Sequence, residues 1–315
     1  MSVDDKRAAL AKLLKAKANS FPLSYGQTAM WFQQHLNPEN TAYNIPLSIV
    51  LNGVIDDVGI VKKSIEYVVS QHSALRTRFK MQGDEPIQSV IDEVKFELPF
   101  RDLSLQLAQD WQKQIREDSI EQASLPFDLE NNNLFRVELL KLSDDRHVIQ
   151  FTIHHIVFDG WSVGIFLRDF GAAYVAYFDQ VTPPIRVKSS YRDFVVEQRK
   201  NLSSTSQTKV LTYWQERLHE CQESLTLPTD KARPEKQSFA GAVWVESIDA
   251  SLSEHLIALA KEQQVTLFVL LLSCVYVYLG KLAGQNDVVL GVSQANRDDT
   301  AFRDLVGLCS EVLPM

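Results

Sequence analysis

The chain alternates between strand-like and helix-like hydrophobic patterns, and this alternation limits its fold more than any other feature. "NIPLSIVLNG" (44–53) alternates as a strand does, whereas "DDVGIVKKSIEYVVSQHSAL" (56–75) places its valines and isoleucines on one helical face. "LFRVELLKL" and "HVIQFTIHH" flank the polar "SDDR", which is typical of a β-hairpin. Ser24 and Gln27 have the spacing of a capping box, which predicts a helix start. The sequence therefore predicts a mixed α/β fold.

The length of 315 residues favours two lobes that share an interface. Residues 219–240 are polar, contain two prolines and lack periodicity. We therefore expect them to link an N-terminal lobe (21–218) to a partial C-terminal lobe (241–315). Residues 1–20 place three leucines on one helical face among basic side chains, which predicts a linker or a short contact helix for a neighbouring acidic domain.

Charge and hydropathy exclude several classes of protein. The net charge of -8, without a local basic patch, argues against nucleic-acid binding. The chain has no run of about 18 apolar residues and no long apolar N-terminal core, so we expect neither a membrane span nor a secretory signal. These features predict a cytoplasmic protein.

The stretch "HHIVFDG" (154–160) ends an otherwise apolar strand with two of the seven histidines of the chain. Strand alternation places His154 and His155 on opposite faces, and His155 continues the more apolar face toward a loop. Either histidine could be a hydrogen-bonded core residue. A metal site would need a further ligand cluster, and serine chemistry would need G-x-S-x-G, and the sequence contains neither. The pattern thus favours an imidazole that acts as a general acid or base.

"HHIVFDGWS" resembles the HHxxxDG motif of condensation domains of nonribosomal peptide synthetases, which belong to the chloramphenicol-acetyltransferase-like superfamily. Further segments resemble this family in the same order: "LSYGQTAMWF", "QHSALRTRF", "YRDFVVEQR", "LPTDKARPEKQSFAGA", "GQNDVVLGVSQANR" and "VGLCSEVLP". The resemblance implies a two-lobed fold in which each lobe has a mixed sheet with flanking helices. It covers about two thirds of such a domain, so we expect an incomplete second lobe whose residues 241–315 expose apolar surface.

The resemblance also implies an activity and partners. The activity would be amide formation between an upstream acyl or peptidyl thioester and a downstream aminoacyl thioester. Both would be held on the phosphopantetheine arms of carrier proteins, beside neighbouring synthetase domains, and we expect no directly bound cofactor or metal. Two alternatives remain open, namely a non-catalytic condensation-like domain that docks carrier proteins or tailoring enzymes, and a free-standing acyltransferase that uses coenzyme A.

The resemblance assigns roles to individual residues. His155 matches the catalytic histidine and His154 a structural one, while Asp159 matches an acid that orients the loop by pairing with an arginine, here Arg76. Gly160 allows a close approach of backbone to substrate. The predicted channel-lining residues are Trp161, Ser162 and Glu311. Glu311 stands where the family has asparagine.

Overall fold

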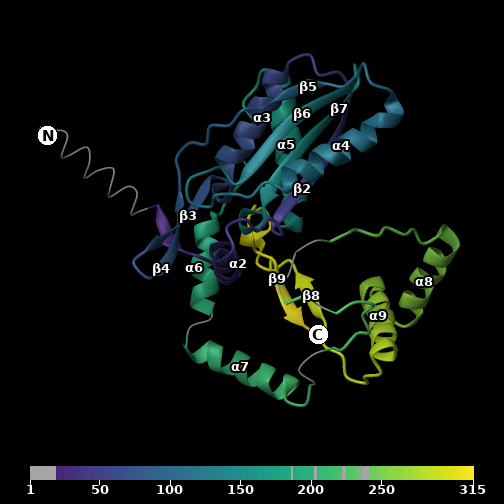
Figure 1. Cartoon of the computed structure of the whole chain (residues 1–315). Helices are drawn as coiled ribbons and strands as arrows, with labels where there is room; N and C mark the ends of the chain where they lie inside the picture. Colours follow the sequence, from purple (N-terminus) through teal and green to yellow (C-terminus); the bar gives the residue numbers. More distant parts are fainter. Residues whose placement is uncertain (1–18, 186, 202–203, 222–224, 233, 236–240) are drawn as a thin grey trace, which may run out of the picture. The chain divides into compact units, whose positions relative to one another are not determined.

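The structure is a computed structural model that describes residues 19–315 except 186, 202–203, 222–224, 233 and 236–240. The chain folds into two compact units (Figure 1). Unit 1 comprises Met1–Ser204 and Ser293–Glu311, and unit 2 comprises Thr205–Val292 and Val312–Met315. The division therefore falls at 204/205, whereas the sequence placed the linker at 219–240. The helix expected over residues 1–20 lies almost entirely outside the described residues.

Unit 1 is built on a four-stranded sheet with the order β2-β7-β6-β5. The strands are β2 (Asn44–Asn52), β5 (Phe100–Asp102), β6 (Phe135–Ser143) and β7 (Arg146–His154). β7 pairs antiparallel with both β2 and β6, whereas β5 pairs parallel with β6. The predicted hairpin is confirmed as β6 and β7. The sheet is thus mixed, as predicted.

Helices cover both faces of this sheet. α3 (Val58–Gln71) and α5 (Gly160–Phe178) pack on the face that carries Ile149, Phe151 and Ile153. α4 (Ala108–Ala123) lies on the opposite face, where Val148 belongs to a smaller apolar cluster. The alternation of β7 explains this arrangement, because successive side chains of a strand point to opposite faces. Each large apolar side chain buried in this way contributes roughly 1.5–3 kcal/mol to stability.

A second, three-stranded sheet of unit 1 has the order β1-β4-β3, with β1 (Ser20–Pro22), β3 (Thr77–Gln82) and β4 (Glu85–Val90). α2 (Tyr25–Leu36) follows β1 and begins with the predicted capping box. The Ser24 side chain accepts a hydrogen bond from the Gln27 backbone, and the Gln27 side chain accepts one from the Ser24 backbone. The Gln27 amide also donates to the carbonyl oxygen of Ile156, at 3.1 Å. α2 is therefore tied to the chain that follows the two histidines.

Two later parts of the chain complete unit 1. α6 (Tyr191–Asn201) packs through three buried residues, and α7 (Ser204–Leu218) follows it along the chain. We call Ser293–Glu311 the returning segment, because it belongs to unit 1 although the chain before and after it belongs to unit 2. It contains the short helix η3 (Thr300–Phe302).

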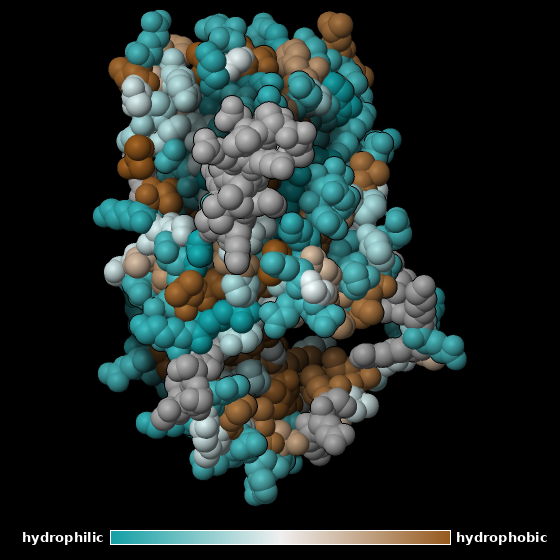
Figure 2. All heavy atoms as spheres, turned by 90° about the vertical axis from the view of Figure 1, so that its left-hand side faces the viewer, coloured by the Kyte–Doolittle hydropathy of each residue, from teal (hydrophilic) through white to brown (hydrophobic). Residues whose placement is uncertain are grey.

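Unit 2 contains most of α7, together with α8 (Ala250–Glu262) and α9 (Leu267–Ala283). It also contains parts of β8 (Gly291–Gln294) and β9 (Glu311–Pro314), which pair as a two-stranded sheet. α9 is strongly apolar, yet none of its residues is buried. Hydrophobic side chains, drawn in brown, gather in the lower part of Figure 2. The expectation that residues 241–315 expose apolar surface is confirmed. Within the described residues no single helix could span a membrane, although α8 and α9 together, bent by 102°, have sufficient length and apolar composition.

Candidate active site

His154 is the last residue of β7 and is fully buried. Its ring packs edge-on against Phe127, with 5.9 Å between the centroids. Nδ1 accepts a hydrogen bond from the Ile156 backbone N–H at 3.1 Å, so the proton of the neutral ring is on Nε2. Burial, followed by the neighbouring His155 ring, lowers the pKa of His154 to about 3. His154 is therefore neutral and holds the strand end in place.

His155 begins the short helix η2 (His155–Val157) and is only half-buried. Its backbone N–H donates to the Tyr43 carbonyl oxygen at 2.8 Å. Its Nδ1 lies 2.7 Å from the carbonyl oxygen of Phe158. Because a carbonyl oxygen can only accept, Nδ1 carries the proton of the neutral ring and Nε2 keeps its lone pair. The adjacent histidines therefore hold opposite tautomers, and only His155 combines a free lone pair with partial exposure.

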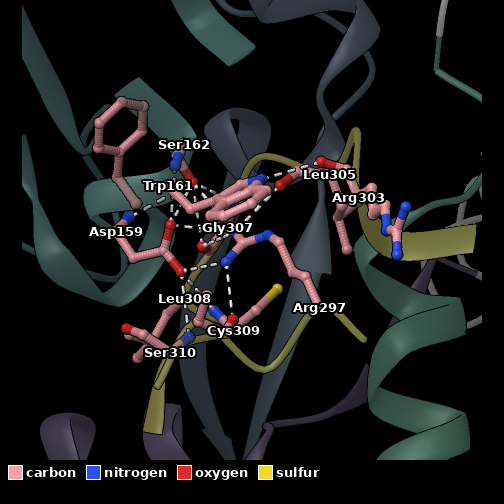
Figure 3. Close-up of polar contacts among 12 residues, drawn as sticks. Asp159, Trp161, Ser162, Arg297, Arg303, Leu305, Gly307, Leu308, Cys309 and Ser310 are labelled. Atoms are coloured by element: carbon pink, nitrogen blue, oxygen red, sulfur yellow. Dashed lines mark hydrogen bonds and ion pairs between the residues drawn. The ribbon is translucent and has the colours of Figure 1, made fainter. Parts of the chain in front are cut away.

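Asp159 starts α5, directly after the histidine loop. Its Oδ1 accepts hydrogen bonds from the Ser162 backbone N–H at 3.0 Å and from the Ser162 hydroxyl at 2.7 Å. The Asp159 backbone N–H donates to the Ser162 hydroxyl oxygen at 3.4 Å, which completes a capping box. Arg297 binds both carboxylate oxygens, with Nη1–Oδ2 at 2.9 Å and Nη2–Oδ1 at 3.0 Å (Figure 3). The side chains of Asp159 and Arg297 are 0% and 1% exposed, respectively. A bidentate, buried ion pair thus fixes the start of α5.

The returning segment supplies the remaining contacts of this ion pair (Figure 3). The backbone N–H groups of Cys309 and Ser310 each donate to Oδ2 of Asp159 at 3.1 Å. Arg297 also donates to the carbonyl oxygen of Leu305. Burial alone would raise the pKa of Asp159, but Arg297 and Ser162 outweigh burial and lower this pKa below its ordinary value. Asp159 is therefore ionised at neutral pH and is a poor proton acceptor.

The site thus contains two adjacent histidines in opposite tautomers and a buried aspartate–arginine pair. We compared the chain that carries this site with known proteins. The family model named "Condensation domain" matches residues 17–315. The chain belongs to the condensation-domain family. Condensation domains of nonribosomal peptide synthetases are acyltransferases that form peptide bonds between carrier-bound substrates.

Similar proteins agree with this membership of the condensation-domain family. The chain is 34% identical over 291 residues to chondramide synthase cmdD of Chondromyces crocatus, and 32% identical over 301 residues to malpibaldin synthetase of Mortierella alpina. These alignments cover 92% and 95% of this chain but only 7% and 5% of the two relatives. The first condensation domain of the calcium-dependent antibiotic synthetase has the same fold. Its TM-score is 0.83 at 21% identity, over 94% of this chain and 69% of that one.

The predicted pairing of Asp159 with Arg76 is wrong. Arg76 instead donates to the carbonyl oxygens of Val69 and Ser70, in the last turn of α3, and to those of Ile91 and Asp92. The last carbonyls of a helix lack intrahelical partners, so a nearby arginine side chain satisfies them. Arg297 occupies the position predicted for Arg76. The signal in the sequence was the segment "GQNDVVLGVSQANR", which resembles the family and ends in this arginine.

The other predicted site residues of this condensation domain differ in environment. Ser162 is 0% exposed and serves the α5 capping box, so the prediction that it lines a channel is wrong. Trp161 is 49% exposed, and its indole N–H donates to the Arg303 carbonyl oxygen at 3.0 Å. A Cβ added to Gly160 would meet no atom within 4 Å, so the space beside the first residue of α5 is open.

Glu311 is half-buried at the end of the returning segment. One carboxylate oxygen accepts a hydrogen bond from the Gln198 side chain at 2.7 Å. The oxygen of the same Gln198 amide accepts a hydrogen bond from the Tyr25 backbone N–H. Gln198 therefore links α6, the start of α2 and Glu311. Across the described ranges, no group of three or more His, Cys, Asp or Glu side chains could hold a metal ion.

Sequence reasoning assigned no role to two further residues of the site. Tyr191 is fully buried. Its hydroxyl donates to the Leu308 carbonyl oxygen at 2.6 Å and accepts a hydrogen bond from the Ser24 hydroxyl, 3.1 Å away. Its ring packs on Gly307, which has a φ of +155°. A Cβ at this glycine would lie 2.4 Å from the ring. Tyr191 and Gly307 thus hold the returning segment against α6 and the start of α2.

Proposed function

We propose that this condensation domain forms an amide bond between an upstream acyl or peptidyl thioester and a downstream aminoacyl thioester. Both substrates are held on phosphopantetheine arms of carrier proteins, which belong to the partners and not to this chain. Family membership supports the reaction class. The observation that carries the proposal is the tautomer of His155, because Nδ1–H is used by the Phe158 carbonyl oxygen and Nε2 keeps a lone pair.

The lone pair on Nε2 defines the step that His155 performs. The amine of the acceptor attacks the thioester carbonyl carbon, so that the C–N bond forms and the C–S bond breaks. His155 accepts a hydrogen bond or the proton from the attacking amine, and this proton passes to the departing thiolate. General base catalysis of this kind contributes typically 10²- to 10⁴-fold to a rate. Correct positioning of the amine adds to this effect.

Asp159 and Arg297 act through position and not through proton transfer. Their ion pair fixes the start of α5, and Gly160 leaves open space beside it. The ionised carboxylate lies only four residues beyond His155 and holds the loop that carries the Phe158 carbonyl oxygen. We assign Asp159, Arg297 and His154 as positioning residues and His155 as the catalytic residue.

The test is amide formation by the full-length protein with one loaded donor carrier and one loaded acceptor carrier. We expect His155→Ala to lower the rate by about 10²- to 10⁴-fold while the melting temperature stays near that of the wild type. His255→Ala is the matched control, because His255 is an exposed histidine on α8. Unchanged amide formation by His155→Ala would remove the catalytic role.

A second candidate is a non-catalytic domain that docks carrier proteins or tailoring enzymes. Glu311 favours the non-catalytic function, because its carboxylate stands where the corresponding motif of condensation domains has the neutral amide of asparagine. The same assay separates the two functions. A docking domain binds the loaded carriers without forming amide in either the wild type or Glu311→Gln, whereas a condensation enzyme forms amide in the wild type. Turnover with coenzyme A thioesters in place of carriers would identify a free-standing acyltransferase.

A further inference from the structure

α4 covers its face of the four-stranded sheet incompletely. A cavity of about 680 Å³ lies between α4, β2 and the sheet. Its floor includes Leu142 and Val148, which are 3% and 1% exposed, and α4 contributes the apolar side chains of Trp111, Ile115 and Ile120. In Figure 1, α4 runs beside the sheet next to β7 and β2. The cavity is thus a groove with an apolar floor, of a volume typical of ligand sites.

Two arginines give this groove its charge. Among the described residues that line it, Arg116 and Arg146 are the only charged side chains, although the chain carries a net charge of -8. Neither guanidinium forms an ion pair or a side-chain hydrogen bond with any described residue. Arginine binds carboxylates and phosphates through paired N–H groups, so two arginines without such partners favour an anionic group.

The length of the groove bears on the shape of its ligand. The α4 residues that line it run from Ala108 to Ile120, which corresponds to about 18 Å at 1.5 Å per residue. The groove is therefore long enough for an extended apolar chain.

An added peptide strand suits the site less well than an apolar chain. In the described part of the molecule β2 and β5 are the edge strands of the sheet, and β2 is the one that lines the groove. Pro46 lies within β2 and has no N–H to donate to an added strand. The side chains of the lining are apolar residues, two arginines and the uncharged polar residues Ser48, Gln109, Gln112 and Ser119.

We propose that the groove between α4 and β2 binds an amphiphilic anion, that is, a linear apolar chain with a terminal carboxylate. The chain would lie along Trp111 and Ile120, and the carboxylate would bind Arg116 or Arg146. Arg146 and His154 stand at opposite ends of the nine-residue strand β7, about 30 Å apart. This site is therefore separate from His155, and binding there does not depend on the proposed acyl transfer.

The test is calorimetric titration of the full-length protein with dodecanoate below its micelle concentration. We expect saturable binding at one site, weakened about tenfold or more by Arg116→Ala with Arg146→Ala, because hydrogen bonds to charged groups are lost. Ile120→Ser should weaken binding through the apolar part of the groove. Lys113→Ala is the matched control, since Lys113 lies on the same helix but does not line the groove.

Three results would overturn the proposal: no saturable binding, equal binding of dodecyltrimethylammonium, and equal weakening by Lys113→Ala. Dodecanoate could also bind the exposed apolar helices of unit 2, but such binding would not change with Arg116 and Arg146. Arg116→Lys with Arg146→Lys keeps both charges and should bind with an intermediate affinity. Since both arginines are exposed, these variants should fold normally, which circular dichroism would verify.

Discussion

α5 in unit 1 and α9 in unit 2 are both long, strongly apolar helices, but they differ completely in burial. Seven residues of α5 are buried, whereas none of α9 is. α5 packs against the four-stranded sheet and α3, while α9 contacts α8 within its own unit. An apolar sequence therefore determines that a helix forms, whereas its burial depends on the elements beside it. Stability should accordingly be concentrated in unit 1.

The same substitution in both helices tests this comparison most directly. Phe166 on α5 is 2% exposed and packs against Phe151 and Phe170, whereas Phe268 on α9 is 58% exposed. We expect Phe166→Ala to lower the free energy of unfolding by about 3–5 kcal/mol. Phe268→Ala should change it by no more than about 0.5 kcal/mol. Urea denaturation measures both, and equal losses would contradict the comparison.

Asp159→Ala is the next largest expected change. It leaves the Arg297 guanidinium buried without its counter-ion, which costs about 3 to 5 kcal/mol. The melting temperature and soluble yield should fall, and Asp298→Ala is the control, because Asp298 is exposed in the same segment. Arg297→Lys should also destabilise, since lysine cannot bind both carboxylate oxygens. An Asp159→Ala protein that melts normally but forms no amide would return Asp159 to the catalytic residues.

A smaller effect is expected where the returning segment meets α6. Gly307→Ala places a Cβ 2.4 Å from the fully buried Tyr191 ring, at a backbone φ of +155°. We expect a loss of about 1–3 kcal/mol in the free energy of unfolding. Gly164→Ala on α5 is the control, because its Cβ would meet nothing within 4 Å and alanine favours helices. Equal stability of both variants would show that the Tyr191 ring can move away from residue 307 without loss of stability.

His154 has the smallest effect at neutral pH, but it makes the stability of unit 1 sensitive to acid. Above about pH 6.5 this histidine is neutral in both the folded and the unfolded chain. Below this pH the unfolded chain binds a proton that the folded chain, with a pKa of about 3, does not bind. Stability should therefore fall by about 1.4 kcal/mol per pH unit as the pH drops from 6.5 toward 3. His154→Gln should have a smaller slope in denaturation curves between pH 6.5 and 4, and an identical slope would contradict this account.

The sequence correctly predicted those elements of the fold that depend on interactions between residues close together in the chain. The capping box of Ser24 and Gln27, the β6–β7 hairpin and the helical pattern of α3 depend on residues close together in the chain. The sequence predicted different environments for the two histidines, and His154 is fully buried whereas His155 is half-buried. Strand alternation is not the cause, because β7 ends at His154 and His155 begins η2. The catalytic role of His155 stays a prediction.

Long-range partners could not be predicted in this way. Arg297 lies 138 residues beyond Asp159, and no periodicity connects the two. The resemblance to condensation domains indicated Arg76 as the partner of Asp159. The Arg76 guanidinium instead donates to carbonyl oxygens at the end of α3, so it is not available to Asp159. The returning segment was missed for a similar reason, because pattern and composition describe neighbours in sequence and not segments that pack together.

The returning segment also sets the order in which unit 1 can be completed. A chain grows from its N-terminus at about 5–20 residues per second, so the Asp159 carboxylate precedes Arg297 by on the order of ten seconds. The backbone groups of Cys309 and Ser310 follow 150 and 151 residues after Asp159. Contacts of such long range also slow folding in general. During synthesis the histidine loop therefore stays without its anchor until most of unit 2 has left the ribosome.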